Sequence, residues 1–129
     1  MSLSIIPPRF EPYLLGLLRI VTALLFLQHG TAKFFHLPHI AMFDGMKIVS
    51  MLGAAGALEI VGGALLLIGL FTRPVAFVLS GMMAVAYFMA HFPKGPLPIL
   101  NGGELAVVYC FVFLFLAAAG PGRFAVDGK

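Results

Sequence analysis

The sequence has little charge. Lys, Arg, Asp and Glu together make up 10% of its 129 residues, whereas 61% are hydrophobic, and the mean hydropathy is +1.07. A typical soluble domain is about 25% charged and about 45–50% apolar, and so short a chain could not bury this much apolar surface in one core. The composition therefore excludes an ordinary soluble domain and indicates a protein whose outer surface is solvated by lipid.

Cysteine is nearly absent. The single thiol, Cys110, lies in an apolar run, so the chain can form no disulfide within itself and has no C-x-x-C pair. It also lacks the cysteine set of an iron–sulfur cluster and a glycine fingerprint for a dinucleotide. If the protein takes part in redox chemistry, the electrons must therefore come from a partner. The basic residues are scattered singly, which argues against nucleic acid as a partner.

Long apolar runs dominate what remains. A transmembrane helix needs about 20 mostly apolar residues, and four windows qualify or nearly qualify: residues 13–35, 51–71, 74–91 and 103–119, the last being the shortest. We therefore predict an all-α fold, a single domain over residues 1–129, with four transmembrane helices in an antiparallel bundle. The start of the chain shows no cleavable leader, so the first window is expected to be an uncleaved signal anchor.

The connections between these windows make more specific predictions. The short Thr72–Pro74 link predicts a tight hairpin between the second and third spans, and glycines in the second span predict close helix packing. Residues 42–51 are a candidate interfacial helix, whereas the prolines of residues 92–100 predict a non-helical loop. Asn101 and Glu104 have the spacing of a capping box at the start of the fourth span.

An even number of spans places both termini on one side of the membrane. That side would carry Arg9, Arg73, Arg123 and Lys129, and the other side Lys33, Lys47 and Lys94. Because cytoplasmic loops carry an excess of Lys and Arg, we predict that both termini are cytoplasmic.

Ionisable side chains within the spans point to a site. Such groups cost about 2.5–3.5 kcal/mol each at membrane depth and normally pair or serve a function. At a rise of about 1.5 Å per residue, His29, Glu59, His91 and Glu104, one from each span, fall at a common depth opposite the termini. We predict that these residues form a ligand-binding layer at that depth. We assign no catalytic residue. The layer and its supporting residues are, in full, His29, Lys33, Glu59, Tyr87, His91, Asn101 and Glu104, with Arg19 and Arg73 in support.

Structural explanations compete with this hypothesis for each residue. Glu59 could neutralise Arg19 or Lys33, and Arg19 could alternatively extend to the membrane surface. His29 could bond a backbone carbonyl, and Glu104 could serve only as a helix cap. The remaining positions have similar readings: His91 as an interfacial residue, Arg73 as a positive-inside anchor, and His36 and His39 as loop residues in water.

Several short strings resemble the DoxX family. They are Leu18-Arg19-Ile20, Phe26-Leu27-Gln28-His29-Gly30 with Lys33, Glu59-Ile60-Val61-Gly62-Gly63, Gly69-Leu70-Phe71-Thr72-Arg73, His91 with the Pro/Gly loop, and Asn101-Gly102-Gly103-Glu104. The resemblance covers about Leu14 to Asp127. It implies a four-helix protein of the bacterial inner membrane. The family's name comes from a subunit of a thiosulfate:quinone oxidoreductase, and other members are labelled oxidoreductases, often without a demonstrated reaction.

Three functions remain open at this point. The first is a quinone-interacting subunit that is not catalytic alone, in which His29, His91 and Tyr87 bond the quinone oxygens and Glu59 or Glu104 exchanges protons. The second is a metal or haem site, although the Glu-x-x-His spacing of di-iron bundles is absent; its weak candidate ligands are His29, His91, Glu59 and Glu104. The third is non-catalytic: binding or transport of a small apolar molecule or lipid, or scaffolding of a membrane complex.

Overall fold

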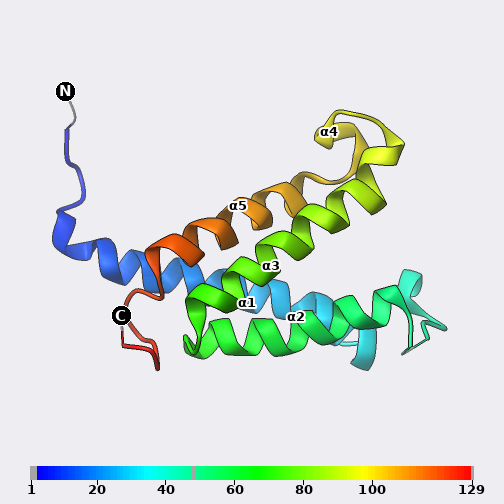
Figure 1. Cartoon of the computed structure of the whole chain (residues 1–129), viewed down its shortest axis with the longest axis horizontal. Coiled ribbons are helices and arrows are strands. Elements are labelled where there is room, and N and C mark those ends of the chain that lie inside the picture. The colour runs from blue at the N-terminus through cyan, green and yellow to red at the C-terminus, as the bar shows by residue number, and fades with distance from the viewer. Residues whose placement is uncertain (1–2, 48, 129) are drawn as a thin grey trace.

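The computed structural model describes residues 3–47 and 49–128, and the predicted all-α fold is confirmed (Figure 1). Long helices form the body: α1 (Glu11–Phe35), α2 (Met51–Ile68), α3 (Thr72–Ala86) and α5 (Glu104–Ala119). Shorter turns flank them. These are η1 (Pro8–Phe10), η2 (Ala41–Phe43), a π-helical turn η3 (Tyr87–His91), η4 (Phe92–Lys94) and α4 (Pro98–Asn101). No strand occurs within the described residues.

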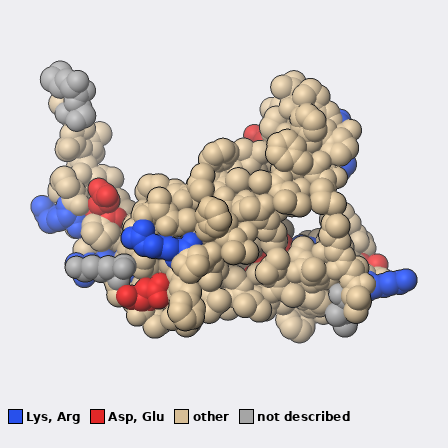
Figure 2. Space-filling view, viewed as in Figure 1, with Lys and Arg blue, Asp and Glu red and all other residues tan. Residues whose placement is uncertain are grey.

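Three helical segments are long and apolar enough to cross a membrane: Pro8–Phe35, Met51–Ile68 and Thr72–Lys94. α5 is equally apolar but has 16 residues, which is about 24 Å of helix against a hydrocarbon core of about 30 Å. Large apolar side chains such as Val61, Phe77 and Phe111 are exposed on the helices. In Figure 2 most of the charged side chains gather toward the two ends of the molecule, and few appear on the surface between them. The chain is a multi-pass membrane protein whose middle contacts lipid.

The helices associate as two pairs. α1 packs mainly on α2, and α3 packs mainly on α5. The pairs lie close together near the end that carries both termini, and they diverge toward the opposite end (Figure 1). The core where they meet includes Phe26 from α1, Leu66 from α2, Leu79 from α3 and Phe113 from α5. The divergence leaves space between the pairs at the end away from the termini.

The α1–α2 contact depends on glycine. A Cβ at Gly30 would lie 2.6 Å from the Ile60 side chain and 3.0 Å from the Gly56 carbonyl oxygen, and a Cβ at Gly56 would lie 2.8 Å from the Phe34 ring. The two backbones therefore approach closely at these positions, as the small residues of α2 predicted. This approach brings Lys33 of α1 within reach of Glu59 of α2.

The connections agree only partly with the predictions. α2 and α3 form the predicted tight hairpin, but α2 ends at Ile68 and the link is residues 69–71, where Gly69 adopts a left-handed conformation (φ 72°). The non-helical prediction for residues 92–100 is wrong, because η4 and α4 each place a proline in their first turn, where its missing N–H is not needed. The interfacial helix over residues 42–51 is also wrong: the described residues between η2 and α2 are turns and irregular backbone, and Ile48 lies outside them.

The segment after α5 folds back across the start of α1. Its carbonyl groups surround Arg19, whose side chain is fully buried: Nε donates to Leu66 O at 2.8 Å, and the guanidinium donates to the carbonyl oxygens of Pro121, Arg123 and Phe124. Both predictions for Arg19 are therefore wrong, since it neither reaches the membrane surface nor pairs with Glu59. The irregular backbone of the C-terminal segment supplies the acceptors instead.

Two further contacts close this end of the molecule. The Asp127 carboxylate accepts hydrogen bonds from the backbone N–H groups of Thr72 and Phe71, each at 2.9 Å, and these bonds hold the pKa of Asp127 below its usual value. Arg73 donates to the carbonyl oxygens of Ala118 and Ala119 at the end of α5. The C-terminal segment thus ties α3 and α5 to α1 on the side opposite the predicted layer.

Candidate functional site

An ion pair lies between α1 and α2. Lys33 Nζ is 2.5 Å from Glu59 Oε1, and the two side chains are 7% and 4% exposed. The Phe43 ring, carried by η2, covers the pair with its centroid 5.4 Å from Lys33 Nζ. Of the partners considered for Glu59, the structure therefore places Lys33 and not Arg19 beside it.

Glu59 also lines a cavity of about 270 Å³ between the two helical pairs. His29 of α1 and His91 of η3 contribute to the same wall, so three of the four residues expected at one depth surround one space. α5 contributes Tyr109. The full lining consists of Phe26, His29, Glu59, Met83, Ala86, His91, Gly102, Leu105, Ala106 and Tyr109.

Tyr109 is the ionisable residue that α5 contributes to the cavity, where the sequence predicted Glu104. Its ring is 5% exposed, meets His29 edge-on at 6.0 Å between centroids, and stacks on Phe113 at 5.7 Å. In the sequence Tyr109 lies about a turn and a half from Glu104 on the same span, and with Phe113 and Leu116 it forms the buried stripe of α5. Tyr109 is the polar residue of this buried stripe, so it is the side chain that α5 can offer to an internal site.

Each of the two histidines contacts a backbone carbonyl oxygen through Nδ1. His29 Nδ1 lies 3.1 Å from Leu25 O, and His91 Nδ1 lies 3.1 Å from Asn101 O. A carbonyl oxygen can only accept, so each Nδ1 carries the proton and the Nε2 of the neutral ring is an acceptor. The carbonyl bond considered as a structural role for His29 is present. It leaves Nε2 of the same ring available for a hydrogen bond to a ligand.

A second set of contacts positions His91. Asn101 is 2% exposed, and its side-chain nitrogen donates to Tyr87 Oη at 3.0 Å and to Gly95 O at 2.9 Å. Its Oδ1 accepts from the Gly103 N–H at 2.8 Å. The centroids of the Tyr87 and His91 rings are 6.3 Å apart. Tyr87 and Asn101 therefore fix the loop and the π-helical turn and do not themselves line the cavity.

The remaining predicted residues lie elsewhere. The capping box is wrong, because Asn101 ends α4, Gly103 caps α5 without a side-chain bond, and Glu104 is the first, exposed residue of α5. Glu104 does not line the cavity. Arg19 and Arg73 belong to the contacts of the C-terminal segment at the opposite end.

An apolar groove adjoins the cavity. It has a volume of about 620 Å³, runs between α2 and α3 where the helical pairs diverge, and meets the cavity at Ala86, which lines both. Figure 2 shows the molecule hollowed between the two pairs on the side away from the termini. Its lining is apolar throughout: Met51, Leu52, Ala54, Ala55, Leu58, Val78, Gly81, Met82, Val85, Ala86, Met89 and Ala90. Ala86 therefore lies between the apolar groove and the polar cavity.

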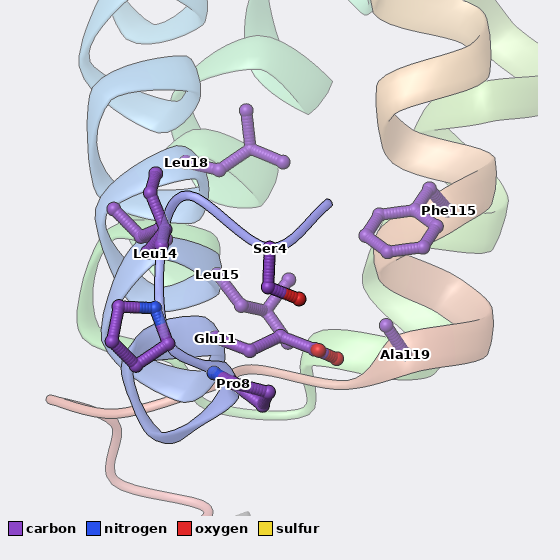
Figure 3. A pocket seen from close by; sticks show the side chains of 10 residues that line it. Ser4, Pro8, Glu11, Leu14, Leu15, Leu18, Phe115 and Ala119 are labelled. Atoms are coloured by element: carbon purple, nitrogen blue, oxygen red, sulfur yellow. The ribbon is translucent and has the colours of Figure 1, made fainter. Parts of the chain in front are cut away.

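A larger hollow lies at the other end, between the N-terminal segment, α1 and α5 (Figure 3). Its volume is about 760 Å³, and its lining offers the polar side chains of Ser4 and Glu11 beside apolar residues such as Leu14, Leu18 and Phe115. It brings no pair of titratable side chains together, so we place the candidate site in the cavity at Glu59.

Apolar helices exposed to lipid around an internal ionisable cavity define a polytopic helical membrane protein with a polar site in its interior. The model of the DoxX family matches residues 14–92. An uncharacterized protein of Haemophilus influenzae is 51% identical over 126 residues, which cover 94% of this chain and 93% of that relative. The chain belongs to the DoxX family, as the resemblance predicted. No solved structure matches it.

Proposed function

We propose that the chain is a quinone-interacting membrane subunit of an oxidoreductase system, a single domain in the bacterial inner membrane. The observation that carries this proposal is the junction at Ala86 between an apolar groove open to lipid and a polar cavity. A quinone has the matching two-part chemistry, an isoprenoid tail and a ring with two oxygens. Ligand sites of this kind are mostly apolar with a few placed polar groups.

The polar groups suit the two redox states of such a ring. The Nε2 atoms of His29 and His91 can accept hydrogen bonds from the hydroxyls of a quinol, and the Tyr109 hydroxyl can donate to the carbonyl of a quinone. Reduction of a quinone takes two electrons and two protons. The Glu59 carboxylate is a proton carrier in reach of the cavity, whereas the electrons must come from a partner subunit, because this chain holds no cysteine set for a cluster.

Quinone binding to the purified protein tests the proposal. We expect a lipid-soluble quinone to co-extract with the wild-type protein, and a short-chain quinone to bind the quinone-free protein in nanodiscs. Tyr109→Phe keeps the packed ring and removes the hydroxyl, so affinity should fall about 10-fold, the loss of about one hydrogen bond. Tyr13→Phe, at an exposed position, is the matched control and should bind like wild type. A wild-type protein that neither carries nor binds quinone would overturn the assignment.

The groove also supports a second candidate, non-catalytic binding of a lipid or small apolar molecule. Its lining lacks polar side chains, so the groove alone would select for hydrophobicity. The same experiment separates the two functions. A co-purified lipid that short-chain quinone does not displace, with binding unchanged in Tyr109→Phe, would favour this second function.

We also propose that both termini are cytoplasmic. Lys33 is buried against Glu59, so it no longer counts as a surface charge. The exposed basic residues are then Lys47 and Lys94 at one end and Arg9, Arg73 and Arg123 at the end with the termini. Lys129 lies outside the described residues. This strengthens the predicted bias toward a cytoplasmic terminal end. C-terminal fusions in a bacterial host should give fluorescent green fluorescent protein and inactive alkaline phosphatase. The reverse pattern would refute the orientation.

A further inference from the structure

The connection between α1 and α2 gathers three metal-ligating side chains. His39 Nε2 lies 2.8 Å from Asp44 Oδ1, and His36 Nδ1 lies 3.8 Å from the same oxygen. All three ligand atoms lie within 4.8 Å of one another. Ligands around a tetrahedral zinc ion, at bonds of about 2.0–2.2 Å, are separated by about 3.3–3.6 Å. The observed spacings bracket this range, so small side-chain rotations would enclose an ion.

Local backbone structure brings these residues together. His36 caps the end of α1 in a left-handed conformation (φ 54°), which reverses the chain. η2 then turns it again, and Asp44 follows directly after that turn. The three ligands come from nine consecutive residues, so their approach depends on this segment alone and not on how the helical pairs pack.

The three side chains are exposed, with 48% of His36, 61% of His39 and 53% of Asp44 accessible. An exposed pair of this kind contributes little to folding, so the cluster has no evident structural purpose. Exposure also leaves room for a water molecule as the remaining ligand. Three protein ligands and one open position are typical of zinc sites that are not purely structural.

We propose that His36, His39 and Asp44 bind a zinc ion at the membrane surface. The ion takes the place of the hydrogen bond between His39 and Asp44, and its ligands are the two ring nitrogens and one carboxylate oxygen. The site is separate from the cavity at Glu59. Phe43, between His39 and Asp44 in the chain, packs on Lys33, so a bound ion would hold η2 over the ion pair. The sequence signal for this site is the His-x₂-His-x₄-Asp spacing, which the reading of His36 and His39 as solvated loop residues overlooked.

Zinc titration of a protein without a histidine tag tests the proposal. In neutral buffer, competition with a chromophoric chelator should show one Zn²⁺ bound per chain. His39→Ala and Asp44→Asn should each weaken binding by more than the about 10–100-fold that loss of an outer-shell partner costs. Zinc should also raise the melting temperature of the wild-type protein in detergent, and not that of the variants.

Matched variants locate the ion. His91→Ala removes one of the candidate metal ligands of the cavity and Cys110→Ser removes the single thiol, and both should retain wild-type zinc affinity. Unchanged melting temperatures of His39→Ala and Asp44→Asn without zinc would show that the variants fold. Binding that survives in His36→Ala, His39→Ala and Asp44→Asn, or that is lost in His91→Ala, would refute the site. Because the assay involves no quinone, its outcome is independent of the proposed function.

Discussion

Arg19→Met is expected to destabilise the protein by about 3–5 kcal/mol, because it leaves several buried carbonyl oxygens without a donor. The methionine preserves much of the volume but cannot satisfy the acceptors at Leu66, Pro121, Arg123 and Phe124. Each buried acceptor left without a partner costs about 1–3 kcal/mol, and partial access of water to the last two limits the sum. Reversible unfolding in mixed detergent measures the loss.

The same substitution should release the C-terminal segment. Limited proteolysis is expected to cleave Arg19→Met within residues 120–128 much faster than the wild-type protein, since Arg19 joins that segment to α1. Arg19→Lys should rescue only part of the stability, because one ammonium group cannot reach the acceptors that the planar guanidinium spans. Arg9→Met, at an exposed residue, is the control. An Arg19→Met protein within about 0.5 kcal/mol of wild type would contradict the structural role.

The sequence predicts those features that depend on local pattern or constant helix geometry. The apolar windows define the helices because only a regular hydrogen-bonded backbone is stable in lipid. The common level of His29, Glu59 and His91 follows from the constant rise of the α-helix and from the short link between α2 and α3. These three residues do line one cavity. Neither feature requires knowledge of side-chain packing.

The predictions for Glu104 and Arg19 were wrong because irregular backbone segments determine the contacts of both residues. The helical rise predicts the depth of Glu104 but not the direction of its side chain, which is exposed at the start of α5. The predicted cap fails because left-handed Gly102 separates α4 from α5, and the Asn101 side chain bonds Tyr87, Gly95 and Gly103 instead. The acceptors of Arg19 are carbonyl oxygens of the segment after α5, and carbonyl groups leave no trace in the identity of the side chains. Only the structure could therefore show that Glu104 does not line the cavity and which carbonyl oxygens bond Arg19.

Removing one partner of the Lys33–Glu59 pair is expected to be costly, whereas removing both is not. Breaking a buried ion pair leaves one uncompensated charge and typically costs about 3–5 kcal/mol, while replacing both partners by apolar residues is often neutral. We therefore expect Lys33→Met and Glu59→Leu each to lose about 3–5 kcal/mol and the double variant to lie within about 1 kcal/mol of wild type. A double-mutant cycle in detergent unfolding measures the coupling directly.

Quinone binding in the same variants separates structure from function at Glu59. If the carboxylate serves only to neutralise Lys33, the stable double variant should bind short-chain quinone as the wild type does. Under the proposed function it should fold and yet lose binding by about 10-fold or more, because one hydrogen-bonding group of the cavity is gone. Glu59→Gln keeps the shape and an amide that can still hydrogen-bond but removes the carboxylate, so it should show a smaller loss in the same direction. Wild-type affinity in both variants would assign Glu59 to the ion pair alone and leave His29, His91 and Tyr109 as the polar groups of the cavity.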